Sequence, residues 1–113
     1  MQYHISRKVN CSFREARERA TEALKTEGFG VLTEIDVAAT MKKKLGEEFR
    51  PYVILGACNP QFAHRALTAE DKVGVLLPCN VVVQQHDDGS VEVSAMAPQA
   101  MLEAIGSPAL SAN

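Results

Sequence analysis

The first part of the chain alternates between apolar and polar side chains before its pattern changes to helical spacing. The period of two along Gln2 to Val9 predicts a half-buried strand. Apolar residues then recur at helical spacing from Phe13 to Glu27. Ser12 and Glu15 stand at the spacing of a capping box, which predicts the helix start, and Gly28 predicts a left-handed cap at its end.

The middle of the chain repeats this order of strand and helix. Phe29 to Ile35 alternates again and predicts a second strand. Asp36 is a good N-cap for a short helix from Val37 to Leu45, which Gly46 ends. The run from Pro51 to Ala57 is almost continuously apolar, which predicts a strand buried on both faces or in the centre of the sheet.

Two further apolar runs follow a third helix start. Asn59 and Pro60 suit the N-cap and the first position of a helix. After that helix, the apolar runs Val73 to Leu77 and Val81 to Gln85 predict two strand segments with a proline-containing break between them.

The last part of the chain carries a hairpin signal. Asp88-Gly89 predicts a tight turn into a return strand from Val91 to Ala95. Pro98 can open a final helix that ends at Gly106, and we expect a frayed tail over residues 107–113.

This order of elements defines the expected fold class. Antiparallel strands with segregated helices are typical of α+β proteins. We therefore predict one domain over residues 1–113, with two layers: an antiparallel sheet of about five strands and helices packed on one face.

The strand from Val91 to Ala95 is expected at an edge of this sheet, where its unpaired backbone groups could be covered by a second copy of the chain. An isologous homodimer is therefore predicted.

Composition and charge narrow the range of partners. The 113 residues are 46% apolar and 23% charged, which is ordinary for a globular domain. A net charge of −2 and an aromatic content of 5% count against nucleic-acid binding, which needs a basic surface and benefits from stacking platforms. His4, Arg7 and Lys8 do not fit a secretory signal peptide, and the longest apolar runs are too short to cross a bilayer. We expect a cytoplasmic protein with no membrane partner.

Two short segments carry the candidate chemistry. Each places a cysteine before an asparagine at the end of an apolar run: Cys58-Asn59 and Cys79-Asn80. A thiol just before a helix N-terminus should have a lowered pKa, which makes Cys58 the expected nucleophile or ligand. If the two segments converge, Cys79 becomes its partner, and the pair could exchange disulfides, carry sulfane sulfur or bind a soft metal ion.

A structural interpretation of these thiols stands beside the chemical one. Free cysteine often packs as a small hydrophobe, so both Cys58 and Cys79 could belong to the core. The chain has three cysteines but no C-x-x-C motif and no zinc spacing, so no metal site is predicted, although His64 or His86 could add ligands. Cys11, beside the first helix cap, is interpreted as incidental.

Several of these segments together resemble a known family. They are Thr33 to Val37, Lys44 to Gly46, Tyr52 to Pro60, Ala66-Leu67 and Gly74 to Val83. Over nearly its whole length, the chain is similar to the family called domain of unknown function 302. The resemblance implies a small homodimeric domain of the TATA-binding-protein-like fold class, in the order strand, helix, four strands, helix. It implies no DNA binding, since the charge is unsuited to it, and it identifies no activity or cofactor.

The expected function follows from the two cysteine segments. We expect a small ligand-binding or thiol- and sulfur-handling site at Cys58 and Cys79, with Asn59 and Asn80 orienting the ligand. The alternative is a non-catalytic binding or interaction module in which both cysteines are structural.

Overall fold

The first two helices begin and end at the capping residues that the sequence predicts. In the computed structural model, which describes residues 2–97, α1 spans Phe13–Thr26. Ser12 Oγ accepts a hydrogen bond of 3.1 Å from the Glu15 N–H, and Gly28 adopts a φ of 84° just after the helix. These contacts satisfy backbone groups that a helix end leaves without partners. The N-cap at Ser12 and the left-handed cap at Gly28 are therefore confirmed, while the Glu15 carboxylate accepts a hydrogen bond from Ser12 Oγ in place of the backbone N–H that a capping box would use.

The second helix is terminated in the same way. α2 spans Val37–Leu45, as predicted, and Asp36 Oδ1 accepts a hydrogen bond of 2.9 Å from the Ala39 N–H. Gly46 follows at a φ of 68°, where a side chain with a Cβ would be strained. The helix joins two strands of the sheet.

Within residues 2–97, five antiparallel strands form one sheet. Their order across it is β1-β5-β4-β3-β2, so β1 and β2 are the edges. The strands are β1 His4–Val9, β2 Gly30–Asp36, β3 Tyr52–Cys58, β4 Cys79–Gln85 and β5 Val91–Met96. The predicted α+β class with a sheet of about five strands is confirmed.

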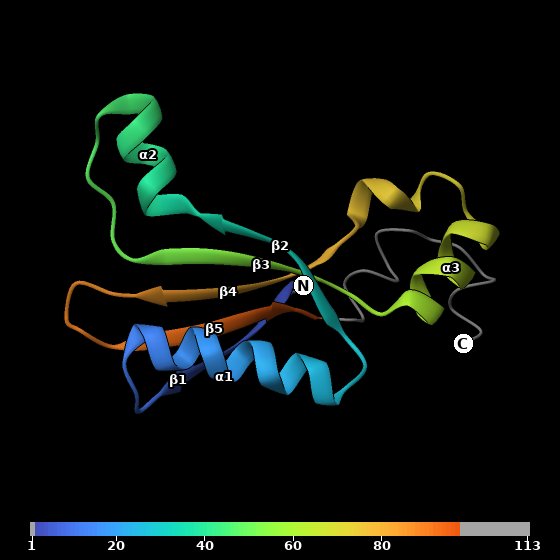
Figure 1. The fold of residues 1–113 in the computed structure, drawn as a ribbon, viewed down its shortest axis with the longest axis horizontal. Helices are drawn as coiled ribbons and strands as arrows, with labels where there is room; N and C mark the ends of the chain where they lie inside the picture. The colour runs from blue at the N-terminus through green and yellow to red at the C-terminus, as the bar shows by residue number, and fades with distance from the viewer. Residues whose placement is uncertain (1, 98–113) are drawn as a thin grey trace.

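One face of the sheet is covered by α1, as Figure 1 shows. Alternate residues of the central strands point into this layer. The buried residues of this core are Ala16, Val53, Leu55, Val81, Val83 and Val91. Burying such side chains contributes about 1.5–3 kcal/mol each, so the α1 layer is the main source of stability.

The other two helices lie at the ends of β3. α2 precedes this strand and α3, Pro60–Ala69, follows it. A short 3-10 helix, η1 (Val73–Leu76), packs with α3 through a small cluster built on Ala66 and Val73. Figure 1 shows α2 and the α3–η1 unit at opposite ends of the molecule. They leave the second face of the sheet uncovered within residues 2–97.

Two predictions were wrong. The segment Val73 to Leu77, predicted as a strand, forms η1, because only Val73 is fully buried while Val75 is 86% exposed. A short apolar run has no periodicity that distinguishes a strand from a helical turn. β5 was predicted at an edge of the sheet. It lies between β1 and β4, because β1, from the start of the chain, pairs with its outer side.

The final predicted helix, from Pro98 to Gly106, lies outside the described residues, as does the tail over residues 107–113. Within residues 2–97, no helix is both long enough and apolar enough to cross a bilayer.

Candidate functional site

The β3–β4 pairing brings the two cysteine segments to the same end of the sheet. Ala57 lies opposite Cys79, and Gly56 lies opposite Asn80. Cys58 is therefore one residue away from the partner of Cys79. The two segments converge, as the chemical interpretation requires.

The two thiols nevertheless belong to different faces. Directly opposed residues share a face of the sheet, so Cys79 points with Ala57 toward the α1 layer. Cys58 still pairs with Gly30 of β2, so it remains within the regular alternation and points toward the uncovered face. Both residues are half-buried. A direct disulfide between them would need the backbone at this end of β3 to move, because their Cβ vectors point apart.

Cys79 borders an apolar cavity of about 290 Å³. The cavity lies between the end of α1, the start of α3 and the adjoining ends of the central strands. Its lining residues are Leu24, Phe29, Ala57, Phe62, Cys79, Asn80, Val81, Ala95 and Met96. Only Asn80 among them has a strongly polar side chain, so the cavity is suited to an apolar molecule.

The environment of Cys79 keeps its thiol protonated. Burial raises the pKa of Cys79 above its ordinary value of 9.0, and the nearby Cys58 thiol raises this pKa further. Both causes disfavour the thiolate, because a buried charge loses solvation and a second negative charge would repel it. The thiol of Cys79 is therefore less reactive at neutral pH than an unperturbed cysteine, because a smaller fraction of it is thiolate.

Asn59 has a structural partner. Its Oδ1 accepts a hydrogen bond of 3.1 Å from the Phe62 N–H, which makes Asn59 the N-cap of α3. Its Nδ2 also lies close to Gly28, where an added Cβ would stand 3.5 Å from it. Asn59 thus holds the start of α3 near the turn that follows α1. Phe62, one wall of the cavity, is positioned by this cap.

Gly56 allows three side chains to close over β3 on the uncovered face. A Cβ at Gly56 would overlap Thr33 Oγ1, approach Pro78 Cγ at 2.9 Å and stand 3.6 Å from Asn80 Oδ1. Asn80 therefore lies over Gly56, at the rim of the cavity. The close packing of these residues depends on the absence of a side chain at Gly56.

The sequence did not reveal the apolar walls of the site. Leu24 comes from α1, Phe29 from the turn before β2 and Phe62 from α3, and each looks like an ordinary core residue in its own segment. His64 is exposed on α3, and His86 bonds Glu92 in the hairpin at the far end of β4. Among the described residues, no three His, Cys, Asp or Glu side chains gather as a metal-ligand set.

The fold and its cysteine-bearing strand ends define a small α+β domain built on one antiparallel sheet. The family model described as "Domain of unknown function DUF302" matches residues 5–113, and the chain belongs to this family. It is similar to a crystal structure of an uncharacterized conserved DUF302 protein from Bacillus stearothermophilus, with 37% identity and a TM-score of 0.89. That match covers 99% of this chain and 87% of the other. A search of curated proteins finds no match.

Proposed function

We propose that the protein binds a small apolar molecule in the cavity beside Cys79. The observation that carries this proposal is a cavity of about 290 Å³ with an almost entirely apolar lining. A cavity of about 150 Å³ is enough to bind benzene. The site is therefore suited to a compact apolar ligand of about two fused rings, or a hydrocarbon of similar size.

The polar groups at the cavity would orient one end of such a ligand. Asn80 supplies an amide at the rim, and Cys79 supplies a neutral thiol as a weak donor. A ligand with an apolar body and one hydrogen-bonding group at its edge would fill the apolar cavity and bond to these polar groups. A charged ligand is disfavoured because the lining contains no countercharge among the described residues.

Indole, which has two fused rings and one N–H, is the probe for this proposal. In a mass-resolved time course with iodoacetamide, indole should slow the alkylation of Cys79 and leave that of Cys11 unchanged. Ala95→Leu, which fills part of the cavity, should abolish this protection. The matched control is Ala69→Leu, at the exposed end of α3. Alkylation of Cys79 that indole does not affect would refute the proposal.

The same time course tests the structural alternative. If both Cys58 and Cys79 are core residues without a ligand, they should label only after denaturant is added, while Cys11 labels in the native protein. That result would favour a non-catalytic interaction module.

Thiol chemistry is a second candidate function, supported by the closeness of Cys58 and Cys79 across β3 and β4. In it, the Cys58 thiolate attacks a small-molecule disulfide and releases one thiolate. Cys79 then attacks the mixed disulfide, forms the Cys58–Cys79 bond and releases the second thiolate, and the two cysteine protons pass to the two released groups. The first step is compatible with the geometry, whereas the second needs β3 to move, as argued above.

Glutathione disulfide tests this chemistry by mass. The exchange should remove two hydrogens from the wild type, and Cys79→Ala should accumulate a glutathione adduct at Cys58. An adduct in the wild type with no internal disulfide would refute the paired reaction.

The proposed homodimer would form at a free sheet edge, and β2 is the edge we assign to it. Leu32 is 68% exposed and Ile35 is 47% exposed on this strand, whose outer backbone groups have no strand partner among residues 2–97. Leu32→Lys should convert the dimer to a 12.3 kDa monomer in sedimentation, whereas Ile5→Lys on the β1 edge should not. A wild type that sediments only as a monomer at micromolar concentration would contradict the dimer.

A further inference from the structure

The uncovered face of the sheet carries a row of polar side chains opposite the α1 layer. The strand registers place Ser6 beside Ser94 and Lys8 beside Glu92. They also place Gln84 between Glu92 and Tyr52. Most of these side chains are half-buried, although no helix among residues 2–97 covers them. The cavity of the proposed function does not require them.

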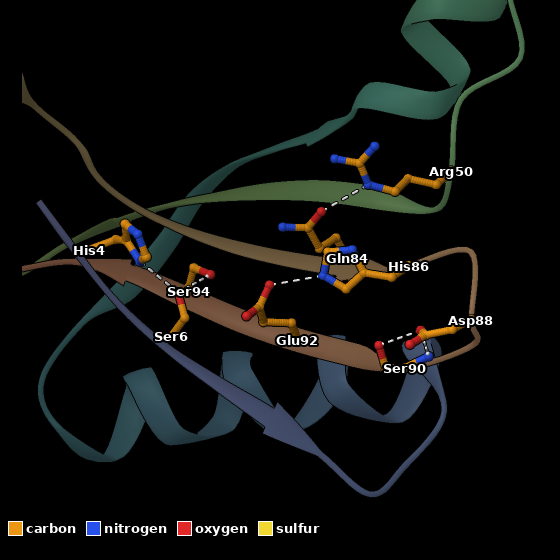
Figure 2. Close-up of polar contacts among 9 residues, drawn as sticks. All are labelled: His4, Ser6, Arg50, Gln84, His86, Asp88, Ser90, Glu92 and Ser94. Carbon is orange, nitrogen blue, oxygen red and sulfur yellow. Dashed lines mark hydrogen bonds and ion pairs between the residues drawn. The ribbon is translucent and has the colours of Figure 1, made fainter. Parts of the chain in front are cut away.

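Figure 2 shows hydrogen bonds that hold Ser6, Ser94, Gln84 and Glu92 of this row in separate groups. His4 Nδ1 lies 2.8 Å from Ser6 Oγ, which lies 2.8 Å from Ser94 Oγ. Each hydroxyl can donate and accept, so the donor and acceptor roles along this series of hydrogen bonds can change to suit a ligand. The residues are therefore held in place while their hydrogen-bonding character stays adjustable.

Two further bonds hold the other end of the row. Glu92 Oε1 lies 3.0 Å from His86 Nε2, and Gln84 Oε1 accepts a hydrogen bond of 2.9 Å from Arg50 Nε. The bond from Arg50 uses only the oxygen of the Gln84 amide, so both N–H donors of that amide are left for other partners. A carboxylate and an amide thus stand side by side on the same face (Figure 2).

The row lines a groove of about 430 Å³. Its polar members include His4, Ser6, Asn80, Gln84, Glu92 and Ser94. Tyr52 and Val82 add apolar surface to its floor. The volume lies within the range of about 300–1,000 Å³ that is usual for small-molecule sites.

The charge of the groove selects the class of ligand. Its described lining contains no lysine and no arginine. Lys8, which belongs to the row, stands opposite Glu92 but is not part of the lining, so the groove itself presents neither of these cations to a phosphate or carboxylate. Arg50 does not line the groove; its guanidinium lies 4.6 Å from the Phe49 ring centre and 5.5 Å from that of Tyr52. Neutral ligands with many hydroxyl groups match the hydroxyls, amides and single carboxylate better than anions do.

We propose that this groove binds a neutral polyhydroxylated molecule, about the size of one or two sugar rings. The hydroxyls of the ligand exchange hydrogen bonds with Ser94, Gln84 and Glu92. The C–H face of its ring lies on Tyr52 and Val82, where aromatic and aliphatic surface would otherwise contact water.

The test is a titration of the full chain, labelled with ¹⁵N, followed by amide shifts. The probes are D-glucose, D-ribose, myo-inositol and maltose, with inorganic phosphate as the anionic comparison. At least one polyol should give saturable shifts at Ser6, Ser94 and Gln84, while phosphate gives none. Saturable binding of phosphate alone, or no saturable shift with any of the four polyols, would overturn the proposal.

Variants locate the binding. Ser94→Ala should weaken polyol affinity roughly 2- to 10-fold, as expected for the loss of one hydrogen bond. Ser90→Ala is the matched control, because Ser90 bonds Asp88 in the hairpin and does not line the groove. Glu92→Gln provides a second variant at the groove if Ser94→Ala fails to fold. Equal affinities in wild type, Ser94→Ala and Glu92→Gln would overturn the assignment.

Two controls separate this groove from other surfaces. Indole protection of Cys79 should be the same in Ser94→Ala as in the wild type, so failure of the cavity proposal and failure of the groove proposal are distinguishable. If shifts on this face instead follow protein concentration without any polyol, the face is an interface between copies, and the ligand proposal is wrong.

Discussion

Gly56→Ala tests the packing that holds the site together. The added Cβ would overlap Thr33 Oγ1 and stand 2.9 Å from Pro78 Cγ, so at least one neighbour must move. Overpacking of this kind costs about 1–3 kcal/mol. Replacing glycine also lowers the conformational entropy of the unfolded chain, which stabilises the folded state by about 0.4–1 kcal/mol. The net expectation is a loss of about 1–2 kcal/mol in the free energy of unfolding.

Gly30→Ala is the matched control for this substitution. Gly30 begins the neighbouring strand β2, and a Cβ added there would have no heavy atom within 4 Å. Gly30 also does not adopt a positive φ. Its replacement should be neutral or slightly stabilising. The two variants therefore differ in contacts while sharing the same chemical change.

Urea unfolding followed by circular dichroism measures the difference at one protein concentration, because self-association would shift the midpoint. With a urea dependence of about 1–2 kcal/mol per molar, Gly56→Ala should unfold at roughly 1 M lower urea than Gly30→Ala. Adding Thr33→Ala should recover part of the loss, and contact with Pro78 should account for the rest. Equal midpoints for Gly56→Ala and Gly30→Ala would refute the packing argument.

Three further predictions concern the caps, the surface and the thiol. Asn59→Ala and Asp36→Ala should each lose about 1 kcal/mol of stability in urea, but only Asn59→Ala should reduce indole protection, because its helix carries Phe62 into the cavity. Glu34→Gln, which breaks an ion pair with Arg17 whose side chains are 38–39% exposed, should cost at most about 1 kcal/mol at low salt and less in 0.5 M NaCl. Because the pKa of Cys79 is raised in the folded state, its thiol contributes stability below pH 9.0, and this contribution should be lost as the pH rises above 9.0. The urea midpoint should therefore decline above pH 9.0, and Cys79→Ala should make that decline less steep.

The helices were predictable because their signals are local. The caps at Ser12, Asp36 and Asn59 act on backbone groups only three residues away, so the sequence contains both partners of each contact. The hairpin at Asp88-Gly89 is local in the same sense, and Gly89 has the positive φ of 88° that such turns favour.

Strand order was not predictable in the same way. The position of β5 depends on its pairing with β1, in which Ile5 lies opposite Ala95. These two strands stand near opposite ends of the described sequence. No short-range pattern in Val91 to Ala95 distinguishes an edge strand from an inner one, since both alternate. The apolar cavity has the same origin, because Leu24, Phe29 and Phe62 meet only through the tertiary fold.

The register of β4 connects the two proposed sites. Val81 and Val83 are buried in the α1 layer, which forces Cys79 to the same face and Asn80 to the other. A slip of one residue would expose both valines and exchange the faces of Cys79 and Asn80, at a cost of about 1.5–3 kcal/mol for each valine. Core packing two and four residues further along the strand therefore decides that the thiol borders the apolar cavity while the amide reaches the polar groove. The Cys79-Asn80 segment is best understood through this alternation, because its neighbouring residues serve opposite faces of the sheet, whereas Asn59 lies beyond β3 and caps α3.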